Sequence, residues 1–89
     1  MINNQKILYK FIQTNKNVDW EYISFYYKLS ENFIIEFQDK VYWYWISKFQ
    51  ILSEDFIREF KDKVNWWCML NYQKLSEKFK EEFKHKLND

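Results

Sequence analysis

The chain contains no glycine, no proline and no alanine, and its 89 residues include one cysteine and one arginine. Without glycine, a glycine-rich phosphate-binding loop is excluded. The single cysteine, Cys68, excludes an internal disulfide bond and suits a reducing compartment. The missing residues have GC-rich codons, whereas the abundant lysine, asparagine, isoleucine, phenylalanine and tyrosine have AT-rich codons. We interpret this composition as the imprint of an AT-rich genome, as in many viruses, phages and some bacteria.

Long apolar runs and an excess of charge are also lacking. No apolar run approaches the roughly 18 residues that a membrane-spanning helix needs, and the opening MINNQKILYK lacks the apolar segment of a signal peptide. The formal net charge is +1, unlike the strongly basic footprint of proteins that bind duplex nucleic acid. These features predict a protein without a membrane partner in the cytoplasm, or in the host cytoplasm if a virus or phage encodes it.

The most prominent feature that is present is an internal repeat. Three segments of 23 residues align without a gap, and nine of their positions are identical. They are VDWEYISFYYKLSENFIIEFQDK from Val18, VYWYWISKFQILSEDFIREFKDK from Val41 and VNWWCMLNYQKLSEKFKEEFKHK from Val64. Such recurrence is typical of stacked repeat proteins. It predicts an all-α, single-domain fold, in the form of a short, right-stacked α-solenoid of helix-turn-helix repeats with a 23-residue period.

The repeat divides the chain into four predicted segments. Residues 1–17 form a degenerate half repeat that serves as an N-terminal cap helix, residues 18–40 the first repeat and residues 41–63 the second. Residues 64–89 form the third repeat with a polar C-terminal cap helix, because EKFKEEFKHKLND is charged on most of its faces. This change of character predicts a complete short array.

The second half of each repeat reads clearly as a helix. A serine followed by glutamate stands where an N-cap is expected, at Ser30, Ser53 and Ser76. Leu29 with Ile34, and likewise Leu52 with Ile57, have the spacing of a hydrophobic staple around that cap. Three glutamate–lysine pairs have the favourable i, i+4 order on the expected solvent side, namely Glu36–Lys40, Glu59–Lys63 and Glu82–Lys86.

The first half of each repeat is less clear. Asp19 and Asn65 are good caps, whereas Tyr42 is not, so the middle repeat begins less cleanly. Trp20, Ile23 and Tyr26 recur in three-residue steps, which favours a helix. The segment VYWYWIS is rich in residues that favour strands, so a strand or a leucine-rich repeat is an alternative. The stepping and the absence of a leucine/asparagine consensus favour the helix.

The consensus W-x-x-I-S-x-Y-Q-x-L-S-E-x-F-I-x-E-F-x-D-K-V is carried best by WISKFQILSEDFIREFKDKV in the middle repeat. It resembles short helical repeats of uncharacterised proteins from large DNA viruses, phages and AT-rich bacteria. The likeness covers residues 18–86 and, weakly, residues 1–17. Cys68-Met69-Leu70 departs from the pattern, which puts the first helix of the third repeat in question. The resemblance implies a repeat architecture and brings no activity and no functional residues with it.

Residues that could carry chemistry are few and scattered. His85, the only histidine, stands in a charged segment, where a solvated surface residue is the ordinary interpretation. Cys68 replaces Tyr22 and Trp45 at its repeat position, and a half-buried inert thiol is the expected state. One cysteine and one histidine do not make a zinc site. We therefore predict no catalytic residues, no metal, no cofactor and no enzymatic activity.

Aromatic residues, 24% of the chain, supply the candidate site. Two rows recur at repeat positions and are predicted to be core, namely Trp20, Trp43 and Trp66, and Phe37, Phe60 and Phe83. Neighbours of the core tryptophans must face elsewhere, because successive helical side chains point about 100° apart. They either pack between repeats or form an exposed ribbon of binding residues. The predicted partner-binding residues are Tyr22, Tyr44, Trp45 and Trp67.

Three functions follow as hypotheses. The first is a non-enzymatic protein-interaction module, specifically a small viral or phage inhibitor of a host protein such as a defence nuclease, in the manner of an anti-CRISPR protein. The second is single-stranded nucleic-acid binding, with bases stacked on aromatic rings and phosphates near Lys6, Lys10, Lys16 and Lys28. The third is self-assembly, for example as a homodimer.

Overall fold

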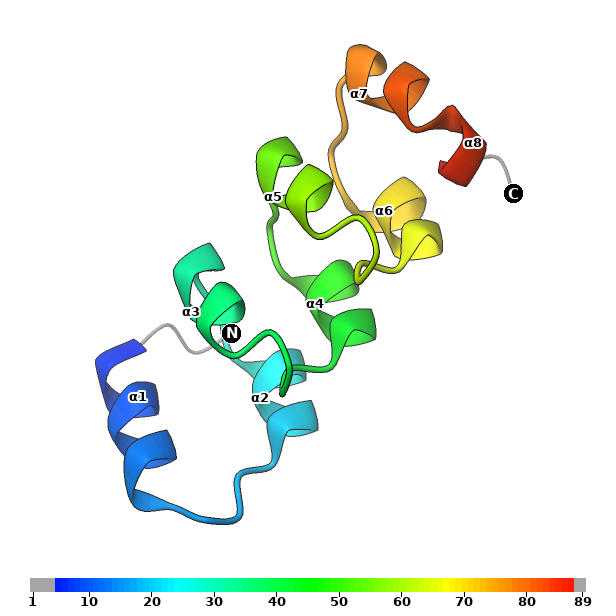
Figure 1. Cartoon of the computed structure of the whole chain (residues 1–89). Helices are drawn as coiled ribbons and strands as arrows, with labels where there is room; N and C mark the ends of the chain where they lie inside the picture. Colours follow the sequence, from blue (N-terminus) through cyan, green and yellow to red (C-terminus); the bar gives the residue numbers. More distant parts are fainter. Residues whose placement is uncertain (1–4, 88–89) are drawn as a thin grey trace. The chain divides into compact units, whose positions relative to one another are not determined.

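The computed structural model describes residues 5–87, and all regular structure in that range is helical (Figure 1). The eight helices described are α1 (Gln5–Thr14), α2 (Trp20–Tyr26), α3 (Glu31–Glu36), α4 (Trp43–Phe49), α5 (Glu54–Glu59), α6 (Trp66–Tyr72), α7 (Glu77–Glu82) and α8 (Lys84–Leu87). The helical interpretation of VYWYWIS is confirmed, because most of this segment lies in α4. The question about the third repeat is also answered, since Cys68-Met69-Leu70 lies within α6.

The helix starts follow the predicted side-chain caps. The hydroxyls of Ser30, Ser53 and Ser76 each accept a hydrogen bond from the backbone N–H three residues later, at 3.1 Å. The Asp19 and Asn65 side chains cap α2 and α6 in the same way, both at 3.0 Å. Helices of six or seven residues are marginal alone, so these local bonds have to be supplemented by packing.

The chain forms two compact units, residues 1–42 and residues 43–89. In the first unit, α1 packs on α3 through Tyr9, whose ring lies 5.2 Å from that of Phe33 in an edge-to-face arrangement. The Gln5 side chain donates to the carbonyl of Lys28 at 2.7 Å and accepts from the N–H of Ser30 at 3.2 Å. One glutamine thus satisfies backbone groups of the connection that leads into α3.

In the second unit, α4 lies beside α6, and α8 contacts both α6 and α7. Gln73 ties α6 to the end of α4, because its side-chain nitrogen donates to the carbonyls of Ser47 at 2.9 Å and Gln50 at 2.7 Å. Arg58, the only arginine, binds the Glu82 carboxylate of α7 through two nitrogens at 3.0–3.2 Å. It also pairs with Asp55 at 2.9 Å.

Each helix pair is built on a tryptophan over two phenylalanines. The three sets are Trp20 with Phe33 and Phe37, Trp43 with Phe56 and Phe60, and Trp66 with Phe79 and Phe83. The prediction that both rows are core holds for Phe60 and Phe83, which are buried, whereas the three tryptophans and Phe37 are only half-buried. The buried interior includes Phe33, Ile34, Phe56, Ile57 and Phe79, which lie on the second helices of the pairs. The buried leucines and isoleucines of both predicted staples agree with the expected packing.

The three predicted Glu–Lys pairs do not lie within single helices. The helices α3, α5 and α7 end at Glu36, Glu59 and Glu82, so the partner lysines lie beyond the helical turn that the i, i+4 spacing requires. The backbone leaves the helix at the following phenylalanine and forms a turn, in which the carbonyls of Phe37, Phe60 and Phe83 accept from the N–H groups three and four residues later. The same turn divides the predicted C-terminal cap helix into α7 and α8.

Candidate functional site

The two faces of α4 explain why four aromatic residues follow one another in the sequence. Helical periodicity turns one set of positions to the interior, namely Trp43, Ile46, Ser47 and, directly after the helix, Gln50. The opposite face carries the remaining side chains, Tyr44, Trp45, Lys48 and Phe49. Helix α6 repeats the division, because Cys68 and Met69 are buried whereas Trp67 and Tyr72 are exposed.

The outward faces of α4 and α6 together form what we call the aromatic–lysine patch, which consists of Tyr44, Trp45, Lys48, Phe49, Trp67 and Tyr72. The Trp45 ring stacks on that of Phe49 at a centroid distance of 5.7 Å and meets Tyr44 edge-on at 4.9 Å. On α6, the Trp67 ring meets Tyr72 at 5.7 Å. Ring pairs of this kind hold a rigid surface in place.

Lys48 joins the two halves of the patch. Its ammonium nitrogen lies 5.3 Å from the ring centre of Phe49 on α4 and 5.3 Å from that of Tyr72 on α6. The rings of Tyr44 and Trp45 are 5.9 Å and 5.8 Å away. These distances are within the range of cation–π attraction. The lysine therefore fixes the rings around one positive charge.

The predicted site residues divide between the units. Tyr44, Trp45 and Trp67 belong to the aromatic–lysine patch, whereas Tyr22 lies on α2 in the first unit. Trp67 is 60% exposed and Tyr44 is 42% exposed, while Trp45 is half-buried against Phe49. A continuous aromatic ribbon along the whole chain stays a prediction. The aromatic–lysine patch lies within the second unit alone.

Tyr22 has aromatic surroundings of its own. Its ring stacks on that of Tyr26 at 5.0 Å and meets Tyr27 edge-on at 6.2 Å. Partial burial against these neighbours raises the pKa of the Tyr22 phenol, and the two nearby hydroxyls add to the rise. Nearly half of the Tyr22 side chain stays exposed, so it is a second, smaller aromatic surface.

Reasoning from the sequence missed Lys48, Phe49 and Tyr72. A signal for the first two was present, because Lys48 stands four residues after Tyr44 and Phe49 four residues after Trp45, which places each pair on one helix face. For Tyr72 no such signal existed. Its contact with Lys48 depends on how α6 lies against α4, and that arrangement is a property of the folded second unit.

Cys68 lies beneath the patch and is completely buried, rather than half-buried as predicted. Burial raises the pKa of its thiol, and the positive charge of Lys48 opposes this rise to a smaller extent. The thiol is therefore protonated near neutral pH and is poorly suited to nucleophilic chemistry.

His85 is exposed on α8, with its ring 6.4 Å from that of Phe83. Within residues 5–87, no three His, Cys, Asp or Glu side chains gather into a group that could hold a metal ion.

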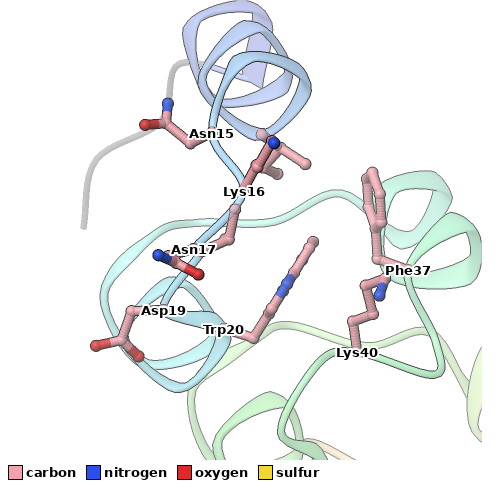
Figure 2. Close-up of a pocket in the computed structure, with 9 residues that line it drawn as sticks. Asn15, Lys16, Asn17, Asp19, Trp20, Phe37 and Lys40 are labelled. Atoms are coloured by element: carbon pink, nitrogen blue, oxygen red, sulfur yellow. The ribbon is translucent and has the colours of Figure 1, made fainter.

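A second candidate is a hollow in the first unit, of about 620 Å³, beside the connection between α1 and α2. Figure 2 shows the rings of Trp20 and Phe37 at this hollow, together with Lys16 and Lys40. It is open to solvent, and two of its polar side chains are engaged in local structure, because Asn15 donates to the Phe11 carbonyl and Asp19 caps α2. Convergent, preorganised polar groups, the usual mark of a small-molecule site, are not found there.

Comparison with protein-family models, curated proteins and solved structures gives no match to this chain. The function is therefore inferred from the geometry and chemistry of the site itself. No helix within residues 5–87 combines the length and apolar character needed to cross a membrane.

Proposed function

We propose that this protein is a non-enzymatic protein-interaction module and that the aromatic–lysine patch is its contact surface. The observation that carries the proposal is the exposure of Tyr44, Phe49, Trp67 and Tyr72 on adjacent helices of one unit. Monomeric proteins rarely leave large apolar side chains clustered in this way unless the cluster binds something. Tryptophan and tyrosine are also the residues that most often dominate binding energy at protein interfaces.

Two broader features belong to the same proposal. The helix pairs stack as a short, right-stacked α-solenoid with a 23-residue period, so that equivalent first helices present one extended binding face. The AT-rich composition and the resemblance to viral and phage repeats suggest a protein that acts in the cytoplasm of a host cell. A stoichiometric inhibitor of a host protein, such as a defence nuclease, fits a small module without catalytic groups.

The test is capture of partners from a host lysate by the tagged protein, followed by mass spectrometry of the wild type and of Trp67→Ala. A specific partner that the wild type retains and Trp67→Ala loses supports the proposal. Because Trp67 is 60% exposed, its removal leaves the interior intact, which circular dichroism checks. Ile35→Ala is the matched control, since it removes an exposed apolar side chain from α3. Equal capture by wild type and Trp67→Ala contradicts the proposed surface.

Single-stranded nucleic acid is the second candidate partner, because exposed rings and a lysine occur together in the patch. Titration with oligonucleotides at two salt concentrations tests it, since binding through phosphates weakens steeply with salt.

Self-assembly is the third candidate function. It predicts a homodimer in light scattering that Trp67→Ala dissociates.

A further inference from the structure

The charges of the second unit are distributed unevenly along the chain. Residues 41–53, which include α4, contain Lys48 as their only charged residue, and residues 64–76, which include α6, contain only Lys74. Among residues 43–87, the acidic residues lie on α5, α7 and the turn between Phe60 and Val64. The segments that contain the first helices of this unit thus contribute no carboxylate of their own, although the whole chain has a net charge of only +1.

Lys48 also differs in its surroundings from Arg58, Lys80 and Lys84 of the same unit, and it has more rings around it than Lys86, whose ammonium group lies over the Trp66 ring alone. Arg58, Lys80 and Lys84 each pair with a carboxylate, at 2.9–3.5 Å. The ion pairs found within residues 5–87 do not include Lys48, whose ammonium group has four aromatic rings around it instead. Rings attract a cation but do not neutralise its charge, so a positive potential remains at the centre of an apolar surface.

We infer that the aromatic–lysine patch binds an acidic segment of a partner protein, with a carboxylate on Lys48 and an adjacent apolar side chain on the rings. This inference rests on the proposed function and adds the chemistry of the partner. The exposed Trp67 and Tyr72 supply the apolar contact beside the charge. Because the surrounding rings exclude water from part of the site, an ion pair formed there is stronger than one in open solvent.

The small number of cations in the patch also favours an acidic protein segment over a nucleic-acid strand as the partner. Affinity for a phosphate backbone comes from several cations that neutralise successive phosphates. The segments that contain the first helices of the second unit offer Lys48 and Lys74 and no arginine, whereas a carboxylate segment needs one well-placed cation and apolar contacts. The arrangement therefore suits a single carboxylate among apolar side chains better than a phosphate chain.

The experiment uses the full chain and two synthetic peptides of equal length, one composed of Glu, Leu and Ser, and a twin with Gln in place of every Glu. Binding is measured by calorimetry at low and at physiological salt. We expect the acidic peptide to bind about fivefold more tightly than its twin, which is the upper end of what one partly exposed ion pair contributes. Lys48→Met should remove this preference while keeping the aliphatic stem among the rings. Lys78→Met is the matched control, because it removes an equal charge from exposed surface of α7 in the same unit.

The outcomes separate the two proposals. Equal binding of the peptides, no binding of either, or an undiminished preference in Lys48→Met overturns the acidic partner. The protein-interaction proposal survives any of these results if lysate capture still depends on Trp67. An oligothymidine that binds more tightly than the acidic peptide, with a steep salt dependence and loss in Lys48→Met, also overturns the inference and assigns the patch to nucleic acid. Loss of preference in Lys78→Met as well as Lys48→Met shows that general charge is responsible and likewise overturns it.

Discussion

At the scale of single residues, two buried serine hydroxyls bind the backbone that follows the second helix of their own helix pair. In the first unit, the Ser24 hydroxyl donates to the Trp20 carbonyl at 2.7 Å and accepts the N–H of Tyr42 at 2.9 Å. In the second unit, the Ser47 hydroxyl accepts the N–H of Asn65 at 2.9 Å. Both serines are completely buried. The repeated Ile-Ser of the consensus is therefore explained by a backbone donor that only a small hydroxyl at that position satisfies.

We predict that Ser47→Ala lowers the free energy of unfolding by about 1–3 kcal/mol, because the buried N–H of Asn65 loses its acceptor. Urea denaturation measures the change. Leu70 occupies the equivalent position of the third repeat and is half exposed, so Leu70→Ser is the matched control and should change stability by less than about 0.5 kcal/mol. An unchanged stability in Ser47→Ala contradicts the role assigned to this hydroxyl.

At the scale of helices, the short length of each helix means that its stability depends mainly on how the backbone groups at its two ends are hydrogen-bonded. The helices α3, α5 and α7 have six residues each, so most of their backbone N–H and C=O groups belong to a first or last turn. Serine caps one end, and the turn at the following phenylalanine satisfies the other. Local chemistry thus defines each helix, and contacts such as Arg58 with Glu82 hold one helix against another.

We predict that Ser53→Ala costs about 1 kcal/mol of unfolding free energy, since the first turn of α5 loses the acceptor for the Phe56 N–H. Ser53→Asp should retain most of the stability, because aspartate caps equally well and its charge suits the helix N-terminus. Thermal unfolding of the three proteins measures the order. Equal losses in both variants would show that the hydroxyl has a role other than capping.

A pH-dependent prediction concerns Arg58. Hydrogen bonds from its guanidinium lower the pKa of the Glu82 carboxyl below its ordinary value in the folded state. A lowered folded pKa stabilises the protein above the unfolded pKa of about 4.3, and this contribution is lost as pH falls through the folded pKa. The stability difference between wild type and Arg58→Met should therefore be largest near neutral pH and shrink below about pH 4.

Stability curves from pH 7 down to 2 measure this difference. Arg58→Lys is the informative second variant, because lysine keeps the charge but cannot bind a carboxylate through a planar fork. It should fall between the wild type and Arg58→Met. A difference that is independent of pH would show that Arg58 acts through its packing over the Phe79 ring, 5.2 Å away, rather than through Glu82.

At the scale of the whole molecule, the three repeats have the same residue types at their packing positions but different residue types at their outward positions. Glu21, Tyr44 and Trp67 occupy one equivalent position, so the side chain outside the core tryptophan changes from acidic to aromatic along the chain. Equivalent packing positions keep their residue types because each helix pair has to bury the same tryptophan and phenylalanines. Outward positions are free of that demand, and in the second unit they supply the aromatic–lysine patch.

The absence of proline predicts the folding kinetics of the whole chain. Slow refolding phases of roughly 10–100 s usually come from proline isomerisation, and this chain has no proline. Refolding from urea, followed by tryptophan fluorescence, should therefore lack such a phase and be insensitive to a prolyl isomerase. A phase on that timescale at low protein concentration would contradict the prediction. One that appears only at higher concentration would indicate association instead.

The sequence by itself determined the helices and most of their starts, because capping and helical periodicity depend on residues only three or four apart. Ser30, Asp19 and Asn65 were identifiable as caps for that reason, whereas for Tyr44, Trp45 and Trp67 the sequence left open whether they pack between repeats or are exposed. The Glu–Lys pairs were wrongly placed within helices, because the end of each helix at Glu36, Glu59 or Glu82 depends on the following phenylalanine turn.

Only the tertiary structure decided which side chains are buried and which meet. Lys48 and Tyr72 are far apart in the sequence, and they come together because α4 and α6 pack side by side. The same packing buries Cys68 completely and leaves Trp67 exposed, although the two are neighbours in the chain. Burial and long-range contacts depend on how helices pack against one another, and the local periodicity of the sequence does not predict that arrangement.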